Sequence, residues 1–240
     1  MNLLLLTAKD FSAPGRVIID DRRFQHCLKV HQARLGDILK VGLLNDKIGS
    51  GRVIFIDQKK MQLEVELSAQ PPEKLPLTLI MALPRPKMLK RIFQTCATMG
   101  VADLILINAY RVEKSYWQSP FLQPEKINEH LCLGLEQGID TGLPKVSLKK
   151  RFKPFVEDEL PNISQNKRLL VAHPYNAVPC PHPDSNGLVS NTTVLAIGPE
   201  GGFIPYEIEK LSNAGFKPIH LGPRILRVET ALSVLLAKLF

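Results

Sequence analysis

Short apolar runs separated by turn residues fill the first seventy residues, a pattern typical of β-strands. Residues 62–67 (QLEVEL) show it best, because polar and apolar side chains alternate there as on a strand with one buried face. A single helix is expected over residues 21–30. Strands are predicted at residues 3–7, 16–19, 37–41, 51–56 and 62–67. Residues 1–70 are therefore predicted to form a small β-rich domain, closed into a barrel.

A different pattern begins at residue 77, where strand-like apolar runs alternate with segments of helical spacing. Between the two patterns, the prolines and charges of residues 71–76 predict a linker. Strands are predicted at residues 77–83, 104–107, 168–172, 193–198 and 218–222, and helices at residues 87–99, 120–138, 205–214 and 227–240. This alternation is typical of a mostly parallel sheet covered by helices on both faces. The chain is therefore predicted to be an α/β protein with its second domain over residues 77–240.

The charge balance adds a candidate partner. Lysine and arginine number 31 against 23 acidic residues, which gives a net charge of +8 and a pI near 9.4. Such an excess favours a polyanionic partner such as nucleic acid. The alternative interpretation is a solvated basic surface without a specific partner.

Cysteine and hydropathy patterns exclude several classes of protein. The four cysteines form no C-x-x-C pair, which argues against a zinc ribbon or a disulfide framework and suits a reducing cytoplasm. Cys180 lies near His173 and His182, but the prolines between them favour an irregular loop, so no metal site is expected. No apolar run is long enough to cross a membrane, and residues 1–6 are too short for a signal peptide, so no membrane association is expected.

Two glycine-containing loops are the strongest candidates for a binding site. Residues 197–203 (IGPEGGF) and 221–227 (LGPRILR) each join a predicted strand to a predicted helix. Both therefore lie beyond the carboxyl ends of parallel strands, where open α/β sheets bind ligands. Neither loop contains the fingerprint of a dinucleotide site or of a phosphate-binding P-loop. The alternative for each loop alone is a tight turn.

Charged side chains gather at the second loop. Arg224 and Arg227 lie at the start of a predicted helix, where positive charge opposes the helix dipole, so a role in holding an anion or a polarised base is favoured. Glu229 follows them, and a solvated helix start is the alternative.

Further basic residues are candidates for phosphate contacts. Arg85 and Lys87 follow the strand predicted at residues 77–83, where an exposed helix start is the alternative. In the first domain the candidates are Arg16, Arg22, Arg23, His26, Lys29, Arg34 and Lys47.

Residues 26–37 (HCLKVHQARLGD), 197–203 (IGPEGGF) and 221–231 (LGPRILRVETA) together resemble the bacterial RsmE family of 16S ribosomal RNA uridine-N3 methyltransferases. The resemblance implies a PUA-like RNA-binding barrel, a SPOUT methyltransferase domain with a C-terminal trefoil knot, and a homodimer. It also implies that the two loops form the walls of an S-adenosylmethionine pocket. The matching residues expected to line this pocket are Gly198, Pro199, Glu200, Gly201, Gly202, Leu221, Gly222, Pro223, Ile225, Leu226 and Thr230.

The chain departs from the family pattern at two positions. Gln32 stands where many members carry an arginine in the barrel. After the long helix, Glu136 and Gln137 match the common EQSGR pattern, but Asp140 stands at the position of its arginine.

The resemblance implies methylation at uridine N3, for which the N3 proton must leave. Arg224 and Arg227 are the candidates for stabilising the resulting negative charge, and Glu200 or Glu229 for accepting the proton. The N3 atom lies on the Watson–Crick edge, so the base must be unpaired. The alternatives are a methyltransferase of the same fold acting on transfer RNA or on a ribose 2′-hydroxyl, and a non-catalytic RNA-binding relative.

Overall fold

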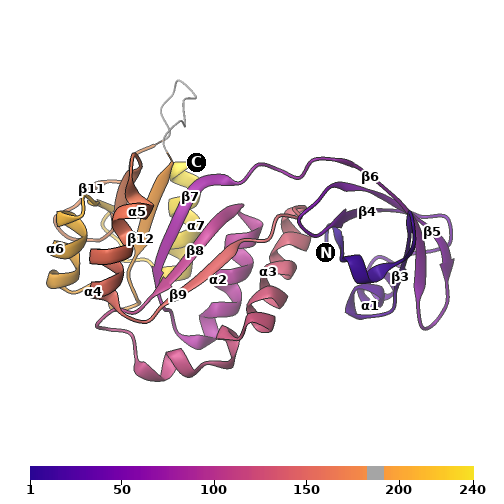
Figure 1. The fold of residues 1–240 in the computed structure, drawn as a ribbon, viewed down its shortest axis with the longest axis horizontal. Coiled ribbons are helices and arrows are strands. Elements are labelled where there is room, and N and C mark those ends of the chain that lie inside the picture. The colour runs from indigo at the N-terminus through magenta and orange to yellow at the C-terminus, as the bar shows by residue number, and fades with distance from the viewer. Residues whose placement is uncertain (183–191) are drawn as a thin grey trace.

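The computed structural model describes residues 1–182 and 192–240, which form two lobes joined end to end (Figure 1). Each lobe is built on one sheet, and each has its own cluster of buried apolar residues. The mixed α/β class predicted from the sequence is confirmed.

The N-terminal lobe contains a curled sheet of six strands in the order β1-β4-β5-β6-β3-β2. β1 pairs with β4 in parallel, and the other neighbours are antiparallel. The predicted strands and the predicted helix are all present, whereas β2 was missed because it is short and largely exposed. The bounds are β1 (Leu4–Leu6), β2 (Phe11–Ala13), β3 (Arg16–Ile19), α1 (Arg22–Lys29), β4 (Ile38–Leu43), β5 (Ile48–Ile56) and β6 (Met61–Ala69), with a 3₁₀ turn η1 at Ala8–Asp10.

The C-terminal lobe contains a parallel sheet of seven strands in the order β11-β13-β10-β12-β7-β8-β9. The strands are β7 (Leu75–Ala82), β8 (Val101–Ile107), β9 (Lys145–Lys149), β10 (Arg168–Ala172), β11 (Val178–Pro179), β12 (Thr193–Ile197) and β13 (Lys217–His220). The helices are α2 (Pro86–Thr98), α3 (Pro124–Gly138), α4 (Phe152–Pro154), α5 (Leu160–Ser164), α6 (Pro205–Asn213) and α7 (Val228–Leu239). The shorter turns are η2 (Lys114–Gln118), η3 (Pro120–Leu122) and η4 (Phe155–Glu159). α2 packs against both α3 and α7.

Three details differ from the sequence prediction. The helix predicted at residues 120–138 is split, because Gln123 is extended before Pro124 and α3 begins only at that proline. β7 begins at Leu75, inside the predicted linker, and the Leu75 amide donates to the Gly100 carbonyl at 2.9 Å. β9 and β11 were not predicted, because β9 is short with three polar residues among its five, and β11 has only two residues, both exposed.

β1 belongs to both lobes. Its residues and the preceding Leu3 alternate between faces, as in any strand. Leu4 and Leu6 are buried in the core of the N-terminal lobe, whereas Leu3 and Leu5 are buried with Ile48 in the core of the C-terminal lobe. Burial on both faces explains why the LLLL sequence lacks polar positions.

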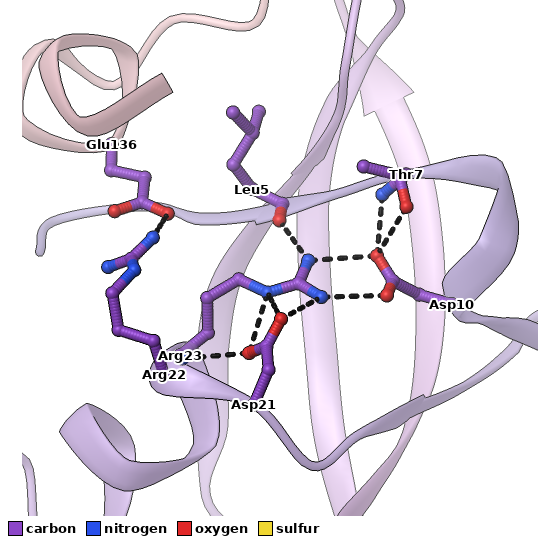
Figure 2. Close-up of polar contacts among 7 residues, drawn as sticks. All are labelled: Leu5, Thr7, Asp10, Asp21, Arg22, Arg23 and Glu136. Carbon is purple, nitrogen blue, oxygen red and sulfur yellow. Dashed lines mark hydrogen bonds and ion pairs between the residues drawn. The ribbon is translucent and has the colours of Figure 1, made fainter. Parts of the chain in front are cut away.

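Arg23 connects three elements of the N-terminal lobe (Figure 2). Its guanidinium donates to both carboxylate oxygens of Asp10 at 2.7 and 2.8 Å, to the Leu5 carbonyl at 2.6 Å and to Asp21 at 3.0 Å. Only 11% of each of the Arg23 and Asp10 side chains is exposed. Burial acts to raise the pKa of Asp10, but the hydrogen bonds from Arg23 and Thr7 hold it below 3.8. The pair therefore stabilises the folded lobe most while Asp10 is ionised.

Replacing Asp10 by asparagine is expected to lower the free energy of unfolding at pH 7 by about 2 kcal/mol, because a buried guanidinium loses one of its two carboxylates. A carboxyl whose pKa is lowered by folding stabilises above its unfolded pKa, and this stability is lost as the pH falls through the folded pKa. The gap between wild type and D10N should therefore shrink below about pH 4, as measured by chemical denaturation. The exposed Asp20→Asn is the control, and an equal loss in that variant would contradict the prediction.

Candidate functional site

The parallel sheet brings the two predicted loops to one edge. The first loop, predicted at residues 197–203, spans residues 198–204 between β12 and α6, and the second loop, residues 221–227, follows β13. β10 lies between these strands, so their ends are roughly 10 Å apart. Its continuation also belongs to this edge, since the His173 amide donates to the Ile219 carbonyl at 2.9 Å. The structure therefore brings the two loops to the same side of one sheet.

The first loop is folded tightly upon itself. The Gly202 amide donates to the Pro199 carbonyl at 2.7 Å, and Gly202 has a φ of 74°. Gly198 is buried, and a Cβ at this position would lie 2.9 Å from the backbone nitrogen of Phe203. No side chain fits there without displacing backbone, so Gly198 is required for the shape of the loop.

The ends of β7 and β8 hold the first loop from the other side. The Arg85 amide donates to Glu200 Oε1 at 3.0 Å, and Arg85 Nε lies 4.0 Å from the same oxygen. The Arg111 guanidinium donates to the Gly201 carbonyl. Glu200 is thus tied to the start of α2. Arg111 was not predicted, because nothing in its local sequence indicates a contact with a loop 90 positions away.

Glu207 is a second residue that the sequence reasoning missed. Its side chain is buried, and the residue is only 3% exposed. Glu207 Oε1 accepts from the Tyr110 amide at 2.7 Å, and Oε2 accepts from the Ile204 amide at 3.0 Å. One carboxylate therefore joins the end of the first loop to the segment after β8. The signal for it was a glutamate at the third position of a helix that starts with proline, where it caps the preceding amides.

The second loop carries charged side chains that are exposed or half-buried. The Gly222 amide donates to His220 Nδ1 at 3.0 Å with Gly222 at a φ of 110°, which fixes the turn after β13. Arg224 and Arg227 are exposed and Glu229 is half-buried. Within the described residues, these three side chains make no hydrogen bond or ion pair.

Predicted pocket residues differ in burial. Gly198 and Pro199 are buried, whereas Gly202, Leu221, Gly222 and Leu226 are partly exposed and Glu200, Gly201, Pro223 and Thr230 are exposed. Ile225 is 71% exposed.

The structure sorts the predicted phosphate-binding residues into three groups. Arg16, Lys29, Arg34, Lys47, Arg85 and Lys87 are exposed. Arg22 is paired with Glu136, and the partly buried His26 lies 3.3 Å from the Met1 nitrogen. The prediction for Arg23 needs correction, because its guanidinium is buried and bound to Asp10 and Asp21 and so does not reach a phosphate.

A match to a protein family decides the class of this fold. The model of the RNA methyltransferase domain matches residues 71–239. The chain belongs to this family. The RNA methyltransferase match covers the whole parallel sheet together with both loops, so the site just described lies inside the family's domain.

Similar proteins confirm the resemblance predicted from the sequence. Ribosomal RNA small subunit methyltransferase E of Treponema pallidum is 29% identical over 235 residues, which cover 96% of this chain and 87% of the relative. Methyltransferase E 1 of Borreliella burgdorferi is 28% identical and covers 96% of this chain and 94% of the relative. The crystal structure of methyltransferase E of Neisseria gonorrhoeae, bound to S-adenosyl methionine, has a TM-score of 0.73 at 19% identity and covers 99% of this chain and 95% of that chain.

No helix among residues 1–182 and 192–240 has the length and apolar character needed to cross a membrane. Over the same ranges, no group of three or more histidine, cysteine, aspartate or glutamate side chains is arranged to hold a metal ion.

Replacing Glu207 by glutamine should loosen the first loop, because an amide NH₂ group does not accept and leaves the Tyr110 or Ile204 amide unbonded. The free energy of unfolding should fall by about 2 kcal/mol, and hydrogen exchange at one of these amides should accelerate. The exposed Glu209→Gln on the same helix is the matched control. Unchanged exchange at both amides would show that Glu207 does not hold the loop.

Proposed function

We propose that this chain uses S-adenosylmethionine to methylate N3 of a uridine in the 16S ribosomal RNA of the small subunit. The observation that carries the proposal is the pairing of two loops at one edge of the sheet of an RNA methyltransferase. One loop is a compact glycine turn, and the other displays two arginines that are unpaired among the described residues. The names of the relatives support the substrate, and the bound ligand of the Neisseria structure supports the cofactor.

The two loops suit a cofactor that is recognised largely by backbone groups. A Cβ on Gly202 or Gly222 would meet nothing within 4 Å, so backbone at both turns faces open space. The exposed side chain of Ile225 offers an apolar contact for an adenine ring or a ribose. Bound in this place, S-adenosylmethionine supplies an activated methyl group. Gly198, Pro199, Gly201, Leu221, Pro223, Leu226 and Thr230 complete the proposed lining.

The charged groups of the site have two proposed roles, which are stabilising the ionised base and accepting its proton. Uridine N3 is a weak acid, so cations near O2 and O4 favour its ionised form. Arg224 and Arg227 are free to bind this charge. Glu229 is the better candidate for accepting the N3 proton, because Glu200 is already bound to the Arg85 amide. Positioning of N3 against the methyl carbon contributes the rest.

The N-terminal lobe is proposed to be a PUA-like barrel that binds the RNA backbone. Its curled sheet supports a barrel, and its exposed Arg16, Lys29 and Arg34 support phosphate contacts. Residues 1–70 then form the RNA-binding domain, and residues 77–240 form a SPOUT domain with a C-terminal trefoil knot. In the sheet, β10 lies between β12 and β13, so the chain crosses from one side of β10 to the other between these two later strands. This crossing supports the knot. A homodimer and a cytoplasmic location complete the proposal, and the free cysteines suit a reducing compartment.

The proposal is tested with purified protein, labelled S-adenosylmethionine and small ribosomal subunits from cells that lack this methylation. Label is expected in N3-methyluridine of 16S RNA, identified by digestion to nucleosides. Transfer RNA and naked 16S RNA serve as parallel substrates. Label in another nucleoside, or in transfer RNA alone, would reject the proposed substrate while keeping the methyltransferase.

Arg224→Ala and Arg227→Ala are each expected to lower kcat about 100-fold, because a group that stabilises charge in the transition state is lost. Affinity for S-adenosylmethionine should change less than threefold in at least one of them, measured by calorimetry. Arg151→Ala removes an exposed arginine from outside both loops and is the control. If both loop variants retain full turnover on subunits, the assignment of these arginines is wrong.

A further inference from the structure

Residues 136–143, which we call the joint segment, carry the polar contacts between the two lobes that are described next. The segment begins near the end of α3 and leads to β9 (Figure 1). The backbone carbonyl of Glu136 accepts from the amides of Asn2 and Leu3 at 2.9 and 3.0 Å. The Asn2 side chain also donates to the Gln137 carbonyl at 3.0 Å, so the joint segment fastens the start of the chain to the C-terminal lobe.

The side chain of Glu136 adds an ion pair across the same boundary. Its carboxylate is 4% exposed and accepts from Arg22 Nη2 of α1 at 2.7 Å, as Figure 2 shows. This hydrogen bond raises the pKa of Arg22 above its ordinary value. Among the described residues, Arg22 is the cation that neutralises this nearly buried carboxylate. While the lobes stay packed, this buried carboxylate would be costly without its partner, so Arg22 supports the packed arrangement.

The far end of the joint segment is fixed in two further ways. Asn45 lies in the turn between β4 and β5. Its backbone amide donates to the Thr141 carbonyl at 2.8 Å, and its side-chain Oδ1 accepts from the Leu143 amide at 2.8 Å. Lys74, just before β7, binds Asp140 Oδ2 at 2.5 Å and the Gly142 carbonyl at 2.6 Å. Asp140 stands where the family pattern has an arginine, and here its reversed charge is matched by Lys74.

We propose that the joint segment sets the direction in which the N-terminal lobe presents RNA to the two loops, with Arg22 and Asp140 as positioning residues. Arg22 is then not a phosphate ligand, although its place among the basic residues of the first domain predicted that role. The inference rests on the proposed function, because it assumes that both lobes engage one RNA substrate. The shared burial of Leu3, Leu5 and Ile48 supports a fixed arrangement rather than a free hinge.

Glu136→Gln separates the two roles of Arg22, because they predict opposite results. If Arg22 binds phosphate, removing the competing carboxylate frees the guanidinium and tightens RNA binding. If Arg22 positions the lobe, the same change weakens productive binding just as Arg22→Ala does. Salt dependence gives a second criterion, since loss of one phosphate contact lowers the slope of log K against log salt by about one.

The experiment measures KM and kcat for small subunits at several salt concentrations, together with S-adenosylmethionine affinity. We expect Arg22→Ala and Glu136→Gln each to raise KM about tenfold. The KM of the double variant should be no higher than the higher KM of the two single variants. The salt slope, kcat and cofactor affinity should stay unchanged, and Arg22→Lys should restore part of the loss. Arg52→Ala, an exposed arginine on β5, is the charge-matched control.

The inference is overturned if Glu136→Gln lowers KM, or if Arg22→Ala lowers the salt slope by about one. Asp140→Asn gives a second arm should Glu136→Gln fail to fold, and an unchanged KM in that variant also contradicts the inference. If the wild type methylates no subunits, the proposed function fails separately. The joint is then tested on the full chain by the distance distribution between spin labels on β5 and α6, which Arg22→Ala should broaden and Arg52→Ala should not.

Discussion

Burial of β1 on both faces is the constraint that relates the two halves of the molecule. A strand with one apolar face serves one core, but Leu3 and Leu5 pack in the core of the parallel sheet while Leu4 and Leu6 pack in the core of the curled sheet. Neither lobe is complete without this strand. The backbone of Glu136 then fixes where β1 starts, and the ion pairs at Arg22 and Lys74 fix how the rest of the N-terminal lobe follows.

At the edge of the parallel sheet, too, a few contacts between distant segments fix the structure. Three groups from outside the first loop hold it in place: the Arg85 amide, the Arg111 guanidinium and the Glu207 carboxylate. The second loop has little such support beyond its turn at Gly222, and its arginines stay unpaired among the described residues. The first loop is fixed by neighbouring segments, and the second loop is exposed and charged. This arrangement suits a site in which the first loop shapes a binding surface and the second loop contacts the substrate.

Much of this was predictable, because the signals were local. The period-two pattern located the strands of the N-terminal lobe, and glycine with proline located both loops. The sequence was a poor guide where a role depends on contacts that no local pattern shows. Arg23 looked like a surface cation, but Asp10 and Asp21 enclose it. Arg111 and Glu207 gave only weak local signals, since each acts on a partner brought near by the sheet. At Asp140 the sequence showed that the arginine of the family pattern is absent, but the charge of this aspartate has a partner in Lys74, which the fold brings near.

The shared strand also has a consequence for the order in which the chain is made. Asn2 and Gln137, which are hydrogen-bonded across the boundary, are 135 positions apart. During synthesis, β1 leaves the ribosome early and finds β4 soon afterwards, while the helix that covers its other face has not been translated. The nascent N-terminal lobe therefore carries Leu3 and Leu5 uncovered until α3 emerges, and exposed apolar surface of this kind attracts chaperones or neighbouring chains. Completion of the catalytic lobe ends that exposure, so maturation of the two lobes is coupled through a strand of three residues.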